Sequence, residues 1–531
     1  MLGNYPVNDD WIFVRQVEAF NNGILKLSAE LDPSFLAQGF LGYLWSKLFG
    51  TSFISFQNLT ILITLLGLWF LIKILKQLEV DKKLLIISSL IYIFNPIVFN
   101  STFSFMTDNY FLTFMLGAIY FFLNKSEKKN ILFGSVFILL ASLTRQVGIF
   151  IGFSFIAAEF YACFVEKKKK NIKNVDKSIL FVFIAVLLGI ILPIIWPDYG
   201  SNRMFLLPEQ ALGRLKQWFL SIYYFPLFMF PLFFGIKTKQ KKVIFSIFLV
   251  VLTLVLYNLD IFSVGNVLYI ENLHTKSDFK TNFSLFDNIF FKLGLSALIA
   301  FSFTKLIYFL KRFMVKGEQK KCSLEKEDIF LLSLFVLNFG ILLISSDFYD
   351  RYLLPSFVCL LILFLKKHKE LIKVDWRVVG SVVLLVLVSI VLQWEFSTKT
   401  RVKYQQARLL TEKTGYYKQI DLDDTYRKYA VSVKENDYTG LIDTKVFDKE
   451  CYVQEYTVDT DCKLLKFVQN IEDKVDKKII GKKKPLGVNK KNIPRVKNNL
   501  DKLVYNQEYF SFLYTLVGKK AYVSSWCTNE N

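Results

Sequence analysis

The chain has 531 residues, of which 53% are hydrophobic and 17% aromatic, and its formal net charge is +21 at pH 7. Its mean hydropathy of +0.36 excludes an ordinary soluble globular protein, and its length leaves room for many membrane spans of ~20 residues. In a membrane protein, an excess of basic residues commonly marks the segments on the cytoplasmic side of the membrane. The positive charge therefore does not by itself indicate a nucleic-acid partner.

The N-terminal segment is polar and lacks the pattern of a cleavable signal peptide. It carries an acidic pair, Asp9 and Asp10, directly before Trp11. Residues 32–50 then place apolar pairs at a helical spacing, which predicts an amphipathic helix lying in the membrane interface. A short additional span is the alternative interpretation of this stretch.

Apolar runs separated by basic segments predict an all-α polytopic membrane protein. We expect twelve spans, at residues 53–75, 84–100, 109–124, 131–143, 146–164, 179–196, 216–235, 243–259, 288–310, 329–345, 352–365 and 378–394. Several are shorter than the ~17–25 residues of an ordinary span. The short pair on either side of Arg145 is therefore expected to form half-buried or broken helices.

Alternate connections differ in their content of Lys and Arg, and the basic set is predicted to be cytoplasmic. The basic connections begin at Lys76, Lys125, Glu166, Lys237, Lys311 and Lys366. The opposite face then receives Asp9, Asp10, Asp108, Arg145, residues 196–217, residues 260–287, residues 347–351 and the tail. The residues with chemical potential are thus predicted to gather on the non-cytoplasmic side.

Three domains are predicted from these patterns. Residues 1–52 form a first external loop, residues 53–394 the transmembrane domain, and residues 395–531 a small extracytoplasmic domain of α/β or mixed structure. The charge of the last domain is interpreted as a solvated surface, with contact to anionic lipid headgroups or an anionic polymer as the alternative. Its three cysteines allow one disulfide if that side is oxidising: Cys451, Cys462 and Cys527.

Asp9, Asp10 and Asp108 are the candidate catalytic residues, because a carboxylate at the end of a span is costly unless it has a partner or a function. The alternative is a helix N-cap or a solvated loop acid. Arg145 and Arg351 are candidate phosphate ligands, since a planar guanidinium can hold two phosphate oxygens. Alternatively, Arg145 extends its charge to the interface, and Arg351 pairs with a neighbouring aspartate.

Other residues complete the candidate site. The predicted substrate-binding set is Arg145, Gln146, Arg351, Tyr352 and Arg203, with Arg214 of second rank. Asp10 and Asp108 are tentative ligands for a divalent cation such as Mg²⁺ or Mn²⁺, although no ligand spacing supports one. His274 lies in an external loop, where a surface role is the simpler interpretation.

Four motifs in this order carry a resemblance to a known superfamily: the acidic pair after Tyr5-Pro6, the Met106-Thr107-Asp108 step, Thr144-Arg145-Gln146, and residues 350–355, Asp-Arg-Tyr-Leu-Leu-Pro. Over about residues 5–395 the chain resembles the GT-C superfamily of membrane glycosyltransferases. The nearest branch is that of the protein O-mannosyltransferases and the lipid A aminoarabinose transferases, with their bacterial relatives.

The resemblance implies transfer of a sugar from a polyprenyl-phosphate carrier to an acceptor outside the cytoplasm, with an acid of the first external loop as base. Asp9 and Asp10 match the paired acids, but the usual second acid is Glu, so the choice of base stays open. Asp108 matches the acid that closes the second external loop, where it would orient acceptor or metal. The family also has a helix before the acidic pair, so we expect a missing start and thirteen spans in all.

The sequence therefore predicts an inverting glycosyltransferase in a membrane, expected to be the bacterial inner membrane, with its site on the non-cytoplasmic side. The implied partners are a lipid-linked sugar, an extracytoplasmic glycan, lipid or protein acceptor, and membrane lipids, with no nucleic acid. The alternative is a transporter or flippase of a lipid-linked glycan. Transporters place charges near the midplane and carry internal repeats, and no convincing repeat is found here.

Overall fold

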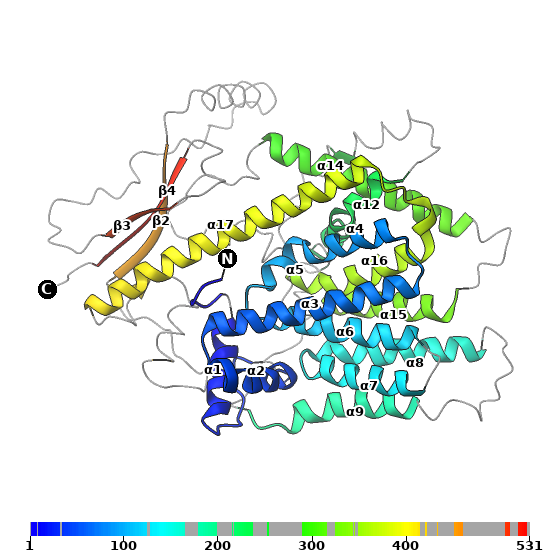
Figure 1. Ribbon diagram of the computed structural model, residues 1–531, viewed down its shortest axis with the longest axis horizontal. Helices are drawn as coiled ribbons and strands as arrows, with labels where there is room; N and C mark the ends of the chain where they lie inside the picture. The colour runs from blue at the N-terminus through cyan, green and yellow to red at the C-terminus, as the bar shows by residue number, and fades with distance from the viewer. Residues whose placement is uncertain are drawn as a thin grey trace. The chain divides into compact units, whose positions relative to one another are not determined.

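The computed structural model divides into two compact units (Figure 1). The first unit contains Met1–Trp11, Ile270–Gly294 and Val391–Asn531, and the second contains Ile12–Tyr269 and Leu295–Ile390. The structure describes residues 2–7, 9–31, 34–124, 128–164, 179–198, 215, 217–236, 252–253, 289–315, 324–343, 345, 349–414, 420–421, 433, 451–459, 505–509 and 519–527. Each unit is described by itself.

The described part of the chain is dominated by helices, as predicted. In the N-terminal half these are α1 (Asp10–Asn21), α2 (Leu36–Phe49), α3 (Phe53–Gln77), α4 (Lys82–Ile93), α5 (Pro96–Ser101), α6 (Thr107–Leu123), α7 (Lys128–Ser142), the 3-10 helix η1 (Gln146–Gly148), α8 (Ile149–Phe164) and α9 (Ile179–Ile195). They continue with α11 (Tyr224–Phe228), α12 (Phe230–Phe234), α14 (Ile289–Val315), α15 (Lys326–Gly340), η5 (Ile341–Leu343), η6 (Asp350–Leu353), α16 (Leu354–His368), η7 (Lys369–Leu371) and α17 (Trp376–Thr414).

The predicted span at residues 84–100 is corrected by the structure, which breaks it into α4 and α5. Asn95 ends the first helix region and caps the second, because its side-chain oxygen accepts a hydrogen bond from the backbone N–H of Ile97 at 3.0 Å. Pro96 occupies the first turn of α5, where its missing N–H costs nothing. A hydropathy pattern does not register this break, because the residues on both sides are apolar.

Apolar helices confirm the membrane character of the chain. Within the described residues, three helices are long and apolar enough to cross a membrane: Phe53–Gln77, Gln146–Cys163 and Trp376–Leu409. Shorter apolar helices are Lys129–Ser142, Ile179–Ile195 and Leu293–Ile307. The total of twelve stays a prediction, and the predicted span at residues 243–259 lies almost wholly outside the described residues.

Helix α6 forms the centre of the second unit and packs between α3 and α7 (Figure 1). Two glycines allow the close approach. A Cβ on Gly67 of α3 would lie 2.6 Å from the Thr113 hydroxyl, and one on Gly117 of α6 would lie 2.6 Å from the ring of Phe137. Thr113 is fully buried and Phe137 is half-buried at these contacts, so this close packing restricts the positions of the three helices.

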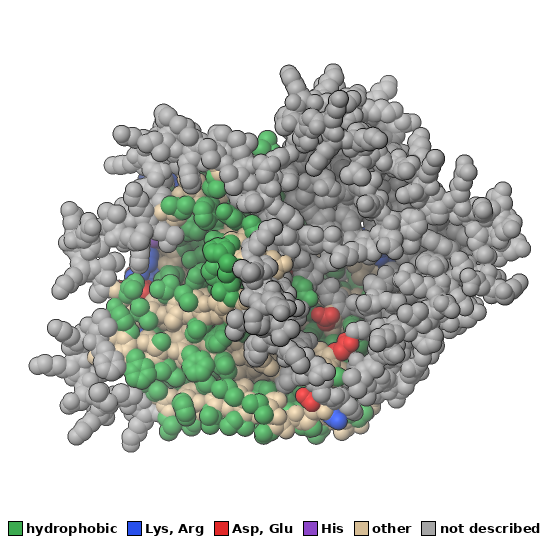
Figure 2. Space-filling model, turned by 180° about the vertical axis from the view of Figure 1, so that it is seen from behind, with side chains coloured by type: hydrophobic (Ala, Val, Ile, Leu, Met, Phe, Trp, Pro, Cys, Tyr) green, Lys and Arg blue, Asp and Glu red, His purple; other side chains and the backbone are tan. Residues whose placement is uncertain are grey.

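Helix α2 corresponds to the helix predicted in residues 32–50. Its inward side is small or polar, with Gly39 and Gly42 buried, while Phe40, Leu44 and Leu48 are exposed at 59%, 47% and 78%. An outward apolar face suits contact with lipid better than contact with water. Hydrophobic side chains are likewise exposed over much of the described surface in Figure 2.

The C-terminal residues contribute a four-stranded sheet in the order β1-β2-β4-β3. Its strands are β1 (Ile420–Asp421), β2 (Cys451–Asp459), β3 (Tyr505–Tyr509) and β4 (Lys519–Cys527). Strand β4 pairs antiparallel with β2 and β3, and the register sets Cys451 opposite Cys527. The predicted boundary between residues 394 and 395 falls inside α17, which continues as a helix to Thr414.

Candidate active site

Asp108 lies in the first turn of α6 with its side chain almost fully buried, at 1% exposure. Met106, which directly precedes α6, provides no side-chain cap for this helix end. The chain is held just before the turn, since the side-chain amide of Gln38 donates to the carbonyl oxygen of Phe105 at 2.9 Å. A carboxylate in this place experiences the favourable field of the helix N-terminus.

Arg145 reaches Asp108 from the segment between α7 and η1. Its Nη1 donates to Asp108 Oδ1 at 2.8 Å, and its guanidinium lies over the ring of Tyr352 at 4.6 Å from the centroid. A charge-assisted hydrogen bond and an aromatic face together restrict the guanidinium to one orientation. The alternative that Arg145 only extends to the interface does not describe this part-buried ion pair.

Arg351 approaches Asp108 from η6, directly before α16. Its Nη1 lies 4.0 Å from Asp108 Oδ2, and its guanidinium faces the rings of Tyr349 at 5.1 Å and Tyr352 at 5.6 Å. The longer distance makes this ion pair looser than that of Arg145. The neighbouring aspartates that are alternative partners for Arg351 are Asp347 and Asp350. Asp347 lies outside the described residues, and Asp350 is fully buried next to Arg351 in η6.

The structure thus brings together four of the residues singled out in the sequence, all in the second unit: Asp108, Arg145, Arg351 and Tyr352. Among these four residues, two guanidinium groups face one carboxylate. Such a cluster can hold an anion with oxygen atoms, because the planar guanidinium group matches the geometry of phosphate and of carboxylate.

Asn109, which the sequence reasoning took only as the start of a span, proves to be part of this region. Its Nδ2 lies 2.9 Å from Thr64 Oγ1, 3.0 Å from Thr102 Oγ1 and 3.3 Å from the carbonyl oxygen of Val98. The sequence did contain a signal, because a polar amide next to an acid in an apolar run needs buried partners.

Asp9 and Asp10 belong to the first unit, so the cluster around Asp108 is described without them. Asp9 is exposed, whereas Asp10 is fully buried at the start of α1 and accepts a hydrogen bond from the backbone N–H of Val7 at 2.6 Å. Nearby, the Tyr5 hydroxyl donates to the carbonyl oxygen of Ser397 at 3.0 Å. Burial raises the pKa of Tyr5, and the Asp10 carboxylate adds a smaller upward contribution.

Of the remaining candidates, Gln146 alone lies among the described residues. Gln146 is exposed as the first residue of η1. Arg203, Arg214 and His274 lie outside the described residues. In the part of the chain that the structure describes, no three His, Cys, Asp or Glu side chains come together as metal ligands. Asp108 is also a poor ligand for a divalent cation, because two guanidinium groups already surround its carboxylate.

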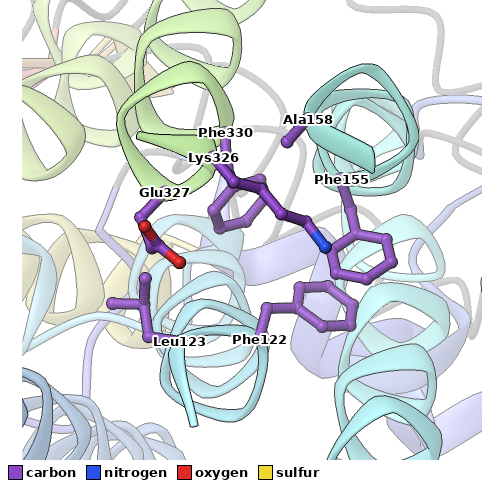
Figure 3. Close-up of a pocket in the computed structure, with 7 residues that line it drawn as sticks. All are labelled: Phe122, Leu123, Phe155, Ala158, Lys326, Glu327 and Phe330. Carbon is purple, nitrogen blue, oxygen red and sulfur yellow. The ribbon is translucent and has the colours of Figure 1, made fainter. Parts of the chain in front are cut away.

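A pocket at the other end of α6 is lined largely by aromatic side chains (Figure 3). An α-helix rises ~1.5 Å per residue, so Phe122 in this pocket lies about 21 Å along the helix axis from Asp108. Phe122, Phe155 and Phe330 surround it, and the ammonium of Lys326 sits 5.4 Å from the Phe155 ring centroid. Lys326 also forms an ion pair with Glu159. The positive charge within this aromatic pocket is therefore the ammonium group of Lys326 itself.

Further ion pairs tie the helices together beside this pocket. Asp328 of α15 forms ion pairs with two lysines at the end of α16, Lys366 at 2.9 Å and Lys367. Carboxylate partners raise the pKa of Lys366 even though burial alone would lower it. These residues join α15 and α16 at their predicted cytoplasmic ends, and the cluster around Asp108 lies at the opposite end of the helices.

A comparison with known families gives one match. Residues 36–196 match the family described as dolichyl-phosphate-mannose-protein mannosyltransferase. The matched segment runs from α2 to the end of α9 and includes Asp108 and Arg145, but not the acidic pair or Arg351. A search of curated proteins found no match. The family match supports a glycosyltransferase of the GT-C superfamily, whose members are integral membrane proteins. It thereby confirms the resemblance drawn from the sequence.

Proposed function

We propose that the protein is an inverting glycosyltransferase that moves a sugar from a polyprenyl-phosphate-type carrier to an acceptor outside the cytoplasm. The observation that carries this proposal is the buried cluster in which Arg145 and Arg351 share Asp108. A lipid-borne phosphate is the anion that a membrane glycosyltransferase must hold, and this cluster offers two guanidinium groups for it.

In the proposed reaction, the acceptor hydroxyl attacks the anomeric carbon of the sugar. The bond from this carbon to the phosphate oxygen breaks, and the electron pair leaves with the phosphate. Arg145 and Arg351 stabilise the negative charge that develops there, which is commonly the largest catalytic contribution. Asp108 holds the two arginines in place, so its role is to position them.

The hydroxyl proton needs a separate base, and Asp10 or Asp9 is proposed for this role. Asp10 is the better candidate of the two, because its side chain is buried while that of Asp9 is exposed. General-base assistance of this kind contributes about 10²–10⁴ to the rate. No step is assigned to a metal at Asp108, and we expect a chelator to leave transfer unchanged.

The test is transfer by the purified protein in lipid nanodiscs, with mannosyl phosphate lipid as the first donor because the matched family is described by that sugar. The variants are Asp9→Asn, Asp10→Asn and Asp108→Asn, and the control is Arg408→Gln, which removes an exposed arginine that pairs with Glu412 of the same helix. We expect transfer to be lost in Asp108→Asn and in either Asp9→Asn or Asp10→Asn. We expect the control Arg408→Gln to retain transfer.

Unchanged turnover in all three aspartate variants would contradict the proposal. A flux of lipid-linked glycan into sealed vesicles that survives these substitutions would instead support the transporter or flippase alternative. An inverted anomeric configuration in the product, determined by NMR, is the outcome expected for a single displacement. A retained configuration would overturn the proposed mechanism even if transfer is observed.

A further inference from the structure

We infer that Asn109 is a positioning residue that fixes the Asp108 carboxylate, and through it Arg145 and Arg351, for the carrier phosphate. This inference rests on the proposed function, and it adds a residue to which neither the sequence patterns nor the family match assigns a role. The observation that carries it is the set of contacts made by the Asn109 amide in the first turn of α6.

The orientation of this amide is determined by its partners. The Thr64 hydroxyl donates its only hydrogen to the Thr60 carbonyl at 2.8 Å, and the Thr102 hydroxyl donates to the Val98 carbonyl at 2.8 Å. Both hydroxyl oxygens can therefore only accept from Asn109. The site contains acceptors alone, so the amide must direct its two N–H bonds toward them, and its oxygen faces away.

These bonds connect three helices at one point. Thr64 belongs to α3, Val98 to α5, and Thr102 is the C-cap residue of α5. Asn109, only 1% exposed, ties the first turn of α6 to both helices. Because α6 has no side-chain cap at Met106, this amide restrains the turn together with the Asp108–Arg145 ion pair and the Tyr110–Thr60 contact. Asp108 is its neighbour in the chain, so a shift of Asn109 moves the carboxylate.

A carboxylate shared by two arginines depends strongly on such a restraint. Arg145 is bound at 2.8 Å and Arg351 lies at 4.0 Å, so a displacement of Asp108 by about 1 Å, a size that costs function in other sites, changes both contacts. The phosphate ligands would then lose their common orientation. Loss of Asn109 should consequently weaken phosphate binding, although Asn109 itself touches no substrate.

The test compares Asn109→Asp with Tyr110→Phe in full-length protein. Asn109→Asp keeps the shape but places carboxylate oxygens against three acceptors. Tyr110→Phe is the matched control, because it removes another fully buried contact between α6 and α3, the 3.2 Å pair of Tyr110 with Thr60. The measurements are the melting temperature and the equilibrium binding of a short-chain polyprenyl phosphate.

We expect Asn109→Asp to bind the polyprenyl phosphate at least about tenfold more weakly than the parent, whereas Tyr110→Phe binds it normally despite a lowered melting temperature. If Asn109→Asp fails to fold, Thr64→Val serves instead, since it removes one acceptor and should weaken binding by about threefold or more. Parent-like binding in a folded Asn109→Asp or in Thr64→Val would overturn the inference. A parent protein that binds no polyprenyl phosphate would overturn the proposed function, and the inference with it.

Discussion

At the scale of single residues, the central feature is the buried carboxylate of Asp108, from which two arginine guanidinium groups lie at unequal distances. Arg145 is held by a short hydrogen bond to Asp108 and by the Tyr352 ring, while Arg351 stands farther away. Arg145 is thus bound more closely to Asp108 than Arg351 is. This difference separates their expected contributions to stability and to binding.

Replacing Asp108 by Asn should lower the free energy of unfolding by about 3–5 kcal/mol, because it leaves buried guanidinium charge without its carboxylate. Arg145→Gln should have a similar cost, and the double variant should cost less than the sum of the two by about 1–3 kcal/mol. Chemical unfolding in detergent micelles measures all three values. Additive effects would mean that Asp108 and Arg145 do not form an ion pair in the protein.

At the scale of elements, the close contact of α3 with α6 determines where the site stands. Gly67→Val should destabilise the protein by about 1–3 kcal/mol, because its side chain would enter the space of Thr113, whose hydroxyl donates to the Ile63 carbonyl at 2.9 Å. The control is Gly380→Ala in α17, where no atom lies within 4 Å of an added Cβ. A gain of about 0.5–1 kcal/mol is expected there. Equal effects of the two substitutions on the melting temperature would contradict this description of the packing.

The sequence predicted the helices best where apolar runs are bounded by charged residues. The limits of α3, α6 and α9 follow such boundaries to within about two residues. It missed the break at Pro96, which leaves the apolar character unchanged on both sides. It also ended the last span near residue 394, because the rest of α17 is polar and hydropathy alone does not detect a polar helix.

Part of the candidate site was predictable for the same kind of reason. Asp108, Arg145 and Arg351 are charges at the ends of apolar runs, and such charges are informative in a membrane protein. Asn109 carries no charge, and its role depends on hydroxyl groups from α3 and α5 that the sequence does not bring together. Tertiary contacts of this kind cannot be read from spacing along a single helix.

At the scale of the whole molecule, the charge pattern predicts which ends of the helices face the cytoplasm. Gln146→Cys, next to the arginine cluster, should react with a membrane-impermeant maleimide added outside intact cells. Lys83→Cys, at the start of α4 and also exposed, should react only after the membrane is opened. Labelling is measured against the parent protein, which contains six cysteines. The reverse pattern would place the cluster on the cytoplasmic side.

The central claim is that Arg145 and Arg351 hold the phosphate of a lipid carrier. It is tested most directly by titrating nanodisc-embedded protein with a short-chain polyprenyl phosphate and comparing Arg145→Gln, Arg351→Gln and the exposed-charge control Arg408→Gln. We predict dissociation constants at least about tenfold higher for the first two variants and unchanged for the third. Parent-like binding in both Arg145→Gln and Arg351→Gln would contradict the account.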